Sequence, residues 1–470
     1  MDQTKGEKLK EELFDKKELG FELVDNKTKE KIFDFNNNYI DFLNKCKTER
    51  ECASFIEEFL KEKGFININE KEKLNPGDKV FYINREKSVY AAVIGKRKLE
   101  KGLNLIGAHI DSPRLDLKPN PLYEASDLAL FKTHYYGGIK KYQWTTIPLS
   151  IHGVIIKKDG EKISISIGEN ENDPIFTITD LLPHLGKKQE AKTLADAVAG
   201  EDLNILIGSI PYNDEKVEEK VKLNILNILN QKYGITERDF TSAELELVPA
   251  FKAKSLGFDA SMVASYGQDD RACAYTALRA FVTLESTEKT AVLILSDKEE
   301  VGSMGNTGME TRNFEVFISQ VLEKTDQNNY NALDSVLVNS KMLSADVTSA
   351  SDPTYESVDE KLNAAYLGKG LAFCKYTGSK GKGGANDANA EYVGYIRKIL
   401  EDNNLLYQIT DMGKVDEGGG GTIAYILANK GIDVIDCGVP VLSMHSPYEV
   451  TSKFDIYNAY ECYKVFYERV

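Results

Sequence analysis

The chain has 470 residues, of which 42% are hydrophobic and 28% charged, and its formal net charge is −15 from 59 basic and 74 acidic side chains. This length predicts two or three domains, or one large domain with an insertion, and the composition is that of a folded globular protein. The acidic balance argues against a nucleic-acid-binding protein, and no run approaches the roughly 20 apolar residues that cross a membrane. We therefore expect neither nucleic acid nor a membrane as a partner.

The N-terminus and the cysteines indicate the compartment. The first 20 residues, MDQTKGEKLKEELFDKKELG, lack the apolar core of a secretory signal. The cysteines form no C-x-x-C pair, so we expect neither a disulfide framework nor a thiolate zinc site. The six are Cys46, Cys52, Cys273, Cys374, Cys437 and Cys462. The sequence thus predicts a cytoplasmic protein.

Hydrophobic periodicity divides the first half of the chain. From about residue 7 to residue 63 apolar residues recur at spacings of three and four, which predicts helices, and Gly64 ends the last of them. Residues 79–96 and 103–113 have the composition of strands, the second apolar enough to be buried on both faces. Residues 146–170 alternate apolar and polar residues around the turn Lys158-Asp159-Gly160, which is typical of an antiparallel hairpin.

A polar helix is predicted near residues 216–232, and from about residue 255 strands and helices alternate again. Strands are predicted at residues 290–300, 335–347 and 432–447, and a helix at residues 271–284. This order predicts an α/β domain interrupted by a mostly β insertion between about Pro119 and Ala250.

Polar side chains gather where the predicted apolar strands end, which is where ligands bind in open α/β sheets. The five clusters are His109-Ile-Asp111, Gln268-Asp269-Asp270-Arg271, Glu299-Glu300, Ser344-Ala-Asp346 and Met444-His445-Ser446. Asp111 follows His109 by two positions, which would place both on one face of a strand and let the carboxylate hold the imidazole.

Each cluster alone also has an ordinary structural explanation. The histidines could be core residues bonded to backbone, the paired aspartates a helix cap, Asp346 a turn cap and the paired glutamates a solvated strand end. Together, two histidines and several carboxylates without a thiolate suit one or two divalent cations. Adjacent glutamates would let one bind metal while the other handles a proton, as a two-metal hydrolase requires.

In this order along the chain, the clusters resemble those of the M18 metallo-aminopeptidases, the aspartyl aminopeptidase family. The matching motifs are His109-Ile-Asp-Ser-Pro113, Gln268-Asp-Asp-Arg271, Lys298-Glu-Glu-Val-Gly-Ser303, Ser344-Ala-Asp346, Met444-His-Ser446 and, in the insertion, Asp180-Leu-Leu-Pro-His184-Leu185. The resemblance implies a three-layer, zinc-peptidase-like catalytic domain with a central mixed sheet, formed by residues 1–118 and 251–470. It also implies an inserted dimerisation domain at residues 119–250, and hydrolysis of the N-terminal residue of peptides.

Carried over position by position, the resemblance implies two divalent metal ions, with zinc the first choice and cobalt or manganese as alternatives. The ligands would be His109 and Asp346 for one ion, Glu300 and His445 for the other, and Asp269 for both. Glu299 would be the general base, and Asp111 would orient His109. Two dications against three carboxylates leave one positive charge, which favours ionisation of a bound water whose pKa falls from about 16 towards about 7.

The resemblance further implies a homo-oligomer in which dimers build a hollow tetrahedral dodecamer. His184 occupies the position of a histidine that completes the neighbouring subunit's active site in this family. We therefore expect His184 to act in trans on the tetrahedral intermediate or the substrate backbone, with an ordinary surface histidine as the alternative.

The sequence leaves the preferred substrate open. Aspartyl aminopeptidases pair acidic N-terminal residues with a basic side chain downstream of the ligand that matches Asp346, but none of the lysines in residues 368–392 aligns clearly with it. These lysines are Lys369, Lys375, Lys380 and Lys382. An acidic preference is one expectation, and an apolar or broad preference is the alternative.

Other functions fit the sequence less well. A deacylase or carboxypeptidase would share the metal chemistry but not the insertion with His184. A non-catalytic, peptide-binding shell protein would predict losses among the site residues, all of which are present. The run Gly418–Gly421 opens a helix without a phosphate-binding fingerprint, so it is better explained as backbone lining the substrate cleft than as a nucleotide site.

Overall fold

The computed structural model describes residues 3–15 and 18–469, and its largest sheet has the strand order β1-β2-β3-β14-β4-β15-β19-β17-β18. The strands are β1 (Ile66–Asn67), β2 (Lys79–Asn84), β3 (Ser88–Val93), β4 (Asn104–His109), β14 (Ala291–Ser296), β15 (Lys341–Ala345), β17 (Leu371–Cys374), β18 (Tyr407–Thr410) and β19 (Asp433–Gly438). The central strands β14, β4, β15 and β19 are parallel, whereas β3 and β17 pair antiparallel with their neighbours β14 and β19. The sheet is mixed, as predicted.

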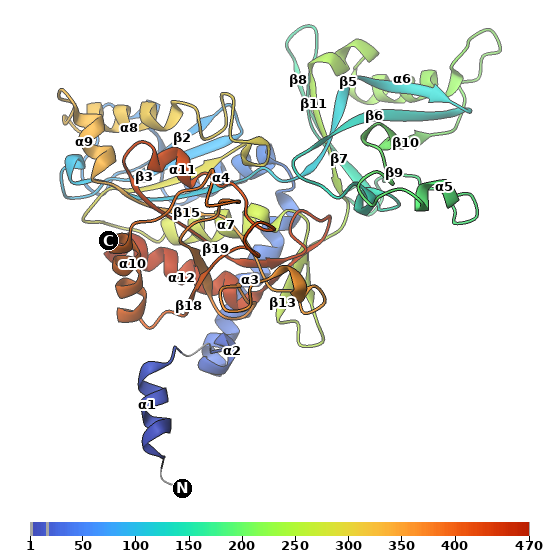
Figure 1. Cartoon of the computed structure of the whole chain (residues 1–470). Coiled ribbons are helices and arrows are strands. Elements are labelled where there is room, and N and C mark those ends of the chain that lie inside the picture. The colour runs from blue at the N-terminus through green and yellow to red at the C-terminus, as the bar shows by residue number, and fades with distance from the viewer. Residues whose placement is uncertain (1–2, 16–17, 470) are drawn as a thin grey trace.

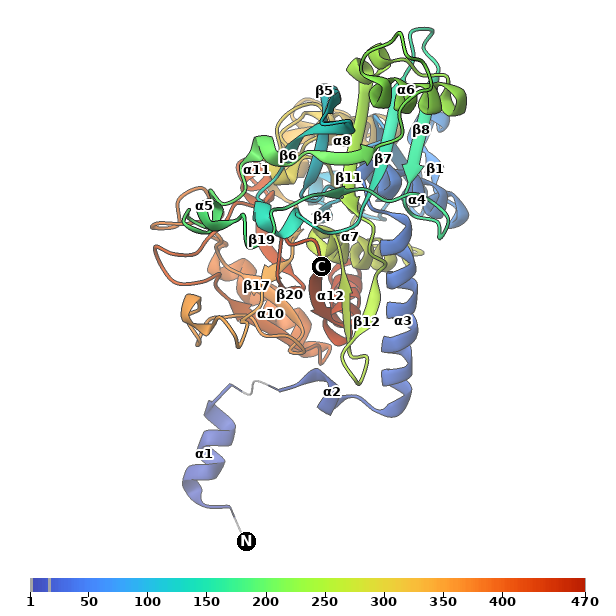
Figure 2. The same cartoon turned by 90° about the vertical axis from the view of Figure 1, so that its right-hand side faces the viewer.

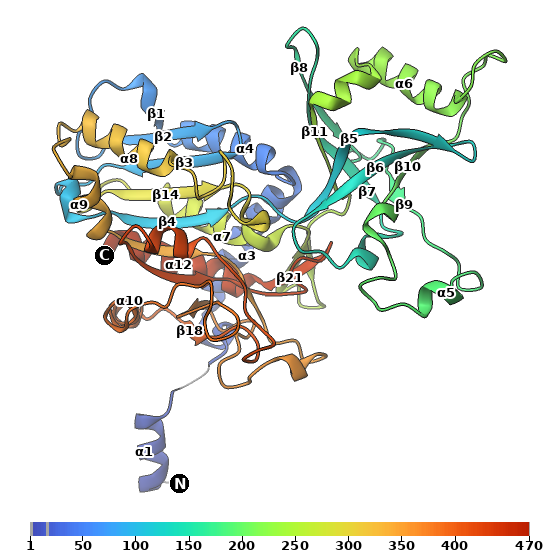
Figure 3. The same ribbon diagram turned by 45° about the horizontal axis from the view of Figure 1, so that its top comes forward.

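Helices cover both faces of this sheet and give three layers (Figures 1 and 3). One face carries α3 (Asn26–Lys45), α4 (Glu49–Glu62), α7 (Gln268–Phe281), α10 (Ala390–Asp402) and α12 (Lys453–Arg469), and the other carries α8 (Asn313–Lys324), α9 (Ala332–Val338) and α11 (Ala424–Ala428). Along β14, Leu293 and Leu295 pack into one core and Val292 and Ile294 into the other, because side chains alternate across a strand. Burial on both faces explains the continuous apolar runs of the sequence.

A second sheet stands beside the three-layer body, with the order β8-β7-β11-β5-β6-β10-β9 (Figure 1). Its strands are β5 (Arg114–Ala125), β6 (Leu128–Tyr136), β7 (Leu149–Ile156), β8 (Lys162–Ile167), β9 (Thr177–Ile178), β10 (Ile205–Gly208) and β11 (Ala243–Pro249), and its helices are α5 (Lys187–Glu190) and α6 (Lys220–Tyr233). It packs its own core around Trp144 and Phe131. The predicted hairpin is β7–β8, and the predicted polar helix is α6. Because β5 begins at Arg114, the predicted boundary at Pro119 falls inside a strand.

A third, smaller sheet has the order β12-β13-β21-β20-β16. Its strands are β12 (Lys254–Leu256), β13 (Met262–Ser265), β16 (Thr348–Ser349), β20 (Pro440–Leu442) and β21 (Glu449–Ser452). The turn after β13 leads into α7, and the turn between β20 and β21 contains His445. This sheet therefore delivers two of the five polar clusters to the body of the molecule.

Several predicted elements differ from the structure. Residues 335–347 were expected to form one strand, but α9 extends to Val338 and β15 begins at Lys341, since a short apolar run does not distinguish helix from strand. The strand predicted at residues 290–300 ends at Ser296, and Glu299–Val301 forms a 3₁₀ turn. The predicted helical region starts with α1 (Lys5–Leu13) and α2 (Gly20–Leu23), and α1, which buries no residue, projects from the body (Figure 2).

Two further predictions concern cysteines and membranes. All six cysteines are buried and free in this structure. Within residues 3–15 and 18–469, no helix combines the length and apolar character needed to cross a membrane.

Candidate metal centre and active site

The strand order brings distant residues to one edge of the large sheet. β4 and β14 are parallel, with Ser296 of β14 paired to His109 of β4, so the turn that carries Glu299 and Glu300 lies beside the end of β4. Asp346 directly follows β15, which is parallel to β4. Because parallel strands end at the same edge, these side chains converge there.

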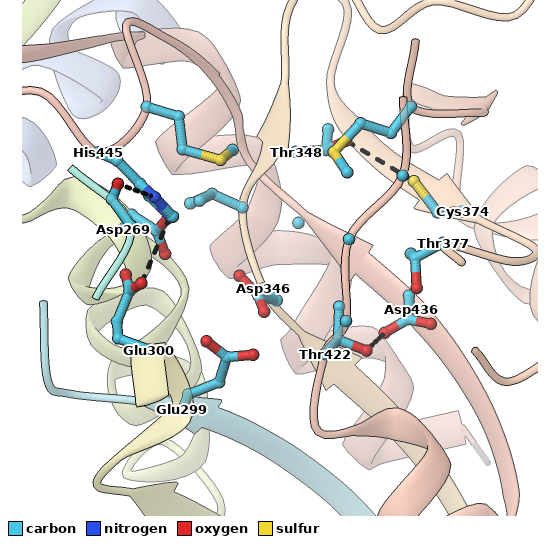
Figure 4. Close-up of a pocket in the computed structure, with 18 of the residues that line it drawn as sticks. Asp269, Glu299, Glu300, Asp346, Thr348, Cys374, Thr377, Thr422, Asp436 and His445 are labelled. Atoms are coloured by element: carbon cyan, nitrogen blue, oxygen red, sulfur yellow. Dashed lines mark hydrogen bonds and ion pairs between the residues drawn. The ribbon is translucent and has the colours of Figure 1, made fainter. Parts of the chain in front are cut away.

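Asp269 contacts both histidines of the cluster, and Figure 4 shows it beside His445 and Glu300. Its Oδ1 is 3.1 Å from Nε2 of His109, and its Oδ2 is 3.1 Å from Nε2 of His445. Asp346 Oδ1 lies 3.8 Å from the same nitrogen of His109, and Glu300 Oε2 lies 3.5 Å from that of His445. The five side chains form two triads that share Asp269, and within each triad the candidate ligand atoms lie within 4.8 Å of one another.

The donor set fits zinc. Each triad offers one imidazole nitrogen and two carboxylates, a combination that borderline divalent cations accept. Burial and the nearby charge of Asp269 raise the pKa of Glu300, and burial and Asp270 raise that of Asp346. Glu300 Oε1 is buried without a hydrogen-bond partner. Crowded, buried carboxylates of this kind are stabilised by bound cations.

Glu299 lies beside both triads but belongs to neither. Its Oε2 is 3.9 Å from Nε2 of His109. Burial, with the charges of Asp269 and Asp111 as further contributions, raises the pKa of Glu299 to about 7. A carboxylate whose pKa lies near neutrality can both accept and return a proton.

The pKa values of Asp269 and His445 are shifted in opposite directions. Burial alone would raise the pKa of Asp269, but hydrogen bonds from His109 and His445 outweigh it and the pKa is lowered. Burial would lower the pKa of His445, but its bond to Asp269 outweighs this and raises the pKa to about 10. Both shifts show how strongly the histidines and the shared carboxylate interact.

Asp111 contacts the other side of His109, but not by the predicted geometry. β4 ends at His109, so the contact is made beyond the strand rather than along one of its faces. His109 Nδ1 lies 3.1 Å from the backbone carbonyl oxygen of Asp111 and 3.2 Å from Oδ1 of its carboxylate. The backbone N–H groups of Glu299 and Glu300 also donate to the two oxygens of Asp111, each at 3.2 Å. Asp111 thus contacts His109 through both its carbonyl and its carboxylate, and the same carboxylate holds the turn that carries both glutamates.

Glu449 supports the cluster but was not among the residues predicted from the sequence. Its buried carboxylate accepts the backbone N–H of His445 at 2.8 Å through Oε1 and that of Asp269 at 3.1 Å through Oε2. Burial raises its pKa to about 8. Its position four residues after the predicted ligand His445 is the feature of the sequence that could have pointed to it.

Asp270 has a further role beyond the helix start at which the sequence places it. Its carboxylate accepts the backbone N–H groups of His109 and Val347.

His184 is not part of this cluster within the chain. It lies between β9 of the second sheet and α5, where its side chain is exposed, and it is not among the residues that line the cavity at the cluster.

A cavity of about 560 Å³ opens beside the triads. Figure 4 shows Asp269, Glu299, Glu300, Asp346 and His445 on one side of it and Thr348, Cys374, Thr377, Thr422 and Asp436 on the other. Gly419, Gly420 and Gly421 line it as well, and the N–H of Gly420 donates to the carbonyl of Thr377 at 2.8 Å. The glycine run is therefore part of the cavity wall.

Comparison with known proteins agrees with these observations. Residues 42–467 match the model of the family described as aminopeptidase I zinc metalloprotease (M18). A probable M18 family aminopeptidase 1 from Clostridium acetobutylicum is 52% identical over 94% of this chain and 96% of its own length. The crystal structure of an M18 family aminopeptidase from Thermotoga maritima superposes with a TM-score of 0.94 at 45% identity, covering 97% of this chain and all of the other. The S. cerevisiae mApe1 dodecamer shares the fold, with a TM-score of 0.74 at 22% identity. The chain belongs to the M18 family of zinc metallo-aminopeptidases.

Proposed function

We propose that the two triads hold two divalent metal ions. Zinc is the metal that we expect, and cobalt or manganese are the alternatives. The observation that carries this proposal is the shared Asp269, whose two oxygens each lie 3.1 Å from a different histidine. His109 and Asp346 would complete the ligands of one ion, and Glu300 and His445 those of the other.

Bound there, the ions would polarise the scissile carbonyl and lower the pKa of a water molecule. In our proposal Glu299 takes the proton of that water and returns it to the leaving amine. Asp111 occupies the Nδ1 side of His109, which would leave Nε2 available to bind a metal ion.

We propose that the inserted unit comprises residues 114–249, with the catalytic domain on either side. This revises the expected boundaries of 118/119 and 250/251. Support comes from the second sheet, whose strand β5 starts at Arg114 and whose strand β11 ends at Pro249, and which has a separate core.

We infer that the enzyme prefers uncharged N-terminal residues to acidic ones. Among the described residues that line the cavity none is lysine or arginine, and Met412, Met444 and Cys374 offer apolar surface. Lys375 and Lys382, which the sequence offered as partners for an acidic side chain, both contact Asp387, at 3.6 and 2.9 Å. An acidic side chain entering the cavity would instead meet the carboxylate Asp436.

We propose that the protein forms a homo-oligomer, with the dodecamer of the family as its assembled form, and that His184 acts in trans. His184 is flanked by exposed apolar side chains, Leu181, Leu182 and Leu185, which a subunit interface would cover. The yeast neighbour of this fold is itself a dodecamer.

A substrate panel tests the proposed activity, its dependence on metal and the proposed specificity. Purified protein is assayed on the p-nitroanilides of leucine, methionine, aspartate and lysine, with and without chelator, and on N-acetyl-leucine p-nitroanilide. We expect hydrolysis of the leucine and methionine substrates to exceed that of the aspartate substrate, to stop with chelator and to return with zinc, and the acetylated substrate to be inert. Preferred cleavage of the aspartate substrate would overturn the specificity, and no hydrolysis despite bound zinc would favour a peptide-binding shell protein.

A further inference from the structure

The inserted sheet reaches the metal-ligand cluster through three consecutive residues at the end of β6. The hydroxyl of Tyr136 donates to Oδ2 of Asp111 at 2.7 Å. Two residues later, the carbonyl oxygen of Gly138 lies 2.9 Å from Nδ1 of His445. The segment Tyr136–Gly138 thus contacts residues on both sides of the cluster, although it belongs to a different sheet.

Gly137 brings this segment into close contact with Glu300. It has a φ of +74°, and a Cβ built on it would lie 3.3 Å from both Cβ and Oε2 of Glu300. The left-handed backbone and this close approach both favour glycine. The segment Tyr136–Gly138 therefore packs directly against Glu300.

The carboxylate of Asp111 makes four polar contacts, and the phenol makes the shortest of them, while the backbone carbonyl of Asp111 separately lies 3.1 Å from Nδ1 of His109. Oδ1 faces His109 and the N–H of Glu299, each at 3.2 Å. Oδ2 accepts the N–H of Glu300 at 3.2 Å and the hydroxyl of Tyr136 at 2.7 Å. Without the phenol, Oδ2 of this fully buried carboxylate would retain only the 3.2 Å hydrogen bond from Glu300. The orientation of the carboxylate would then be less well fixed.

The ring of Tyr136 is itself held by the junction between the inserted sheet and the body. The guanidinium of Arg114 lies 3.9 Å from the ring centroid. Arg114 Nη1 is 3.4 Å from Glu49 at the start of α4, and Nε is 3.1 Å from Glu246 of β11. The position of the phenol therefore depends on how the inserted sheet packs against the body.

We propose that Tyr136 is a positioning residue for the aminopeptidase reaction, through which the inserted sheet sets the orientation of Asp111, and with it His109 and the Glu299–Glu300 turn. This inference rests on the proposed roles of those residues. Burial and the charge of Asp111 raise the pKa of Tyr136, so the phenol stays protonated and can only donate to the carboxylate.

The test compares Tyr136→Phe with Tyr135→Phe, a matched control in which the neighbouring exposed tyrosine loses its hydroxyl. For Tyr136→Phe we expect kcat to fall about 10–100-fold, as for other residues that support a metal ligand, and zinc loss to a competing chelator to be faster by a similar factor. KM should stay within about twofold of wild type, because Tyr136 does not line the cavity. Tyr135→Phe should match wild type in all three measurements.

A double-mutant cycle with Asp111→Asn separates positioning from general damage. If Tyr136 acts through Asp111, the double variant should be no slower than Asp111→Asn alone, because the two effects share one interaction. Wild-type kcat and zinc retention in Tyr136→Phe, or additive losses in the double variant, would overturn the inference. If Glu299→Gln keeps full activity, the proposed mechanism fails instead, so the two failures are distinguishable.

Discussion

Glu299 Oε2 lies 3.9 Å from Nε2 of His109, yet the glutamate belongs to neither ligand triad. We predict that Glu299→Gln keeps the metal ions and loses turnover by about 10²–10⁴-fold or more, because the amide preserves shape but accepts no proton. Steady-state kinetics and the zinc content of the same preparation check this. Glu323→Gln, on the exposed face of α8, is the control and should match wild type. Near-normal turnover in Glu299→Gln would remove Glu299 as the base.

Because Asp269 belongs to both triads, we expect its replacement to remove more metal than the replacement of Asp346. Asp269→Asn should abolish binding of both metal ions, whereas Asp346→Asn should weaken one site and leave about one ion per chain, because only Asp269 belongs to both triads. Metal analysis after dialysis measures this, with the exposed Asp334→Asn as control. Equal losses in the two ligand variants would contradict a shared Asp269.

The trans role of His184 predicts complementation between inactive variants. His184→Gln and Glu299→Gln should each have low activity alone. After the two are dissociated, mixed and reassembled, sites that combine Glu299 from one subunit with His184 from its neighbour should restore part of the activity. An unchanged kcat in His184→Gln, or no recovery in mixed oligomers, would assign His184 to the ordinary surface.

The predicted ligands could be found from the sequence because they lie at the ends of strands. His109 and Asp346 end or follow apolar runs that form parallel neighbours, so a general rule for α/β sheets placed them at one edge. Their convergence with Asp269 and His445, which come from the small sheet, was expected only from the resemblance to a family. No local pattern shows that the turns of β13 and β20 reach the same edge.

The supporting residues could not be predicted in the same way. Tyr136 and Gly138 come from the inserted sheet, and their contacts with Asp111 and His445 span 25 and 307 residues. Such contacts depend on how two units pack, which periodicity does not encode. The short apolar stretch before Lys341 was also predicted incorrectly. Its composition is compatible with a strand, but in the structure it forms the end of helix α9.

His152 links the inserted sheet to α4 and predicts a pH dependence of stability. Its Nδ1 lies 2.7 Å from Glu51 and its Nε2 3.1 Å from Glu169. Burial lowers the pKa of His152, but hydrogen bonds to Glu169 and Glu51 outweigh it, so the pKa is raised above its ordinary value of 6.5. A raised histidine pKa stabilises the folded state fully below pH 6.5, and this contribution is lost as the pH rises through the raised value.

We therefore expect His152→Gln to lower the free energy of unfolding by about 1–3 kcal/mol at pH 6, the range for hydrogen bonds to charged groups. The difference from wild type should shrink as the pH rises. Denaturant unfolding between pH 6 and pH 9 measures it, and the exposed His134→Gln serves as control. A difference that grows with pH would show that neutral His152 is the stabilising form.

In the proposed site, five side chains that are distant in sequence hold two metal ions around the shared carboxylate of Asp269. Diffraction data from crystals of the zinc-loaded protein, collected on both sides of the zinc absorption edge, would locate these ions. We expect two anomalous peaks in each subunit, one on either side of the Asp269 carboxylate, with His109 and Asp346 at one and Glu300 and His445 at the other. A single peak, or peaks that Asp269 does not contact, would rule out the shared dinuclear site.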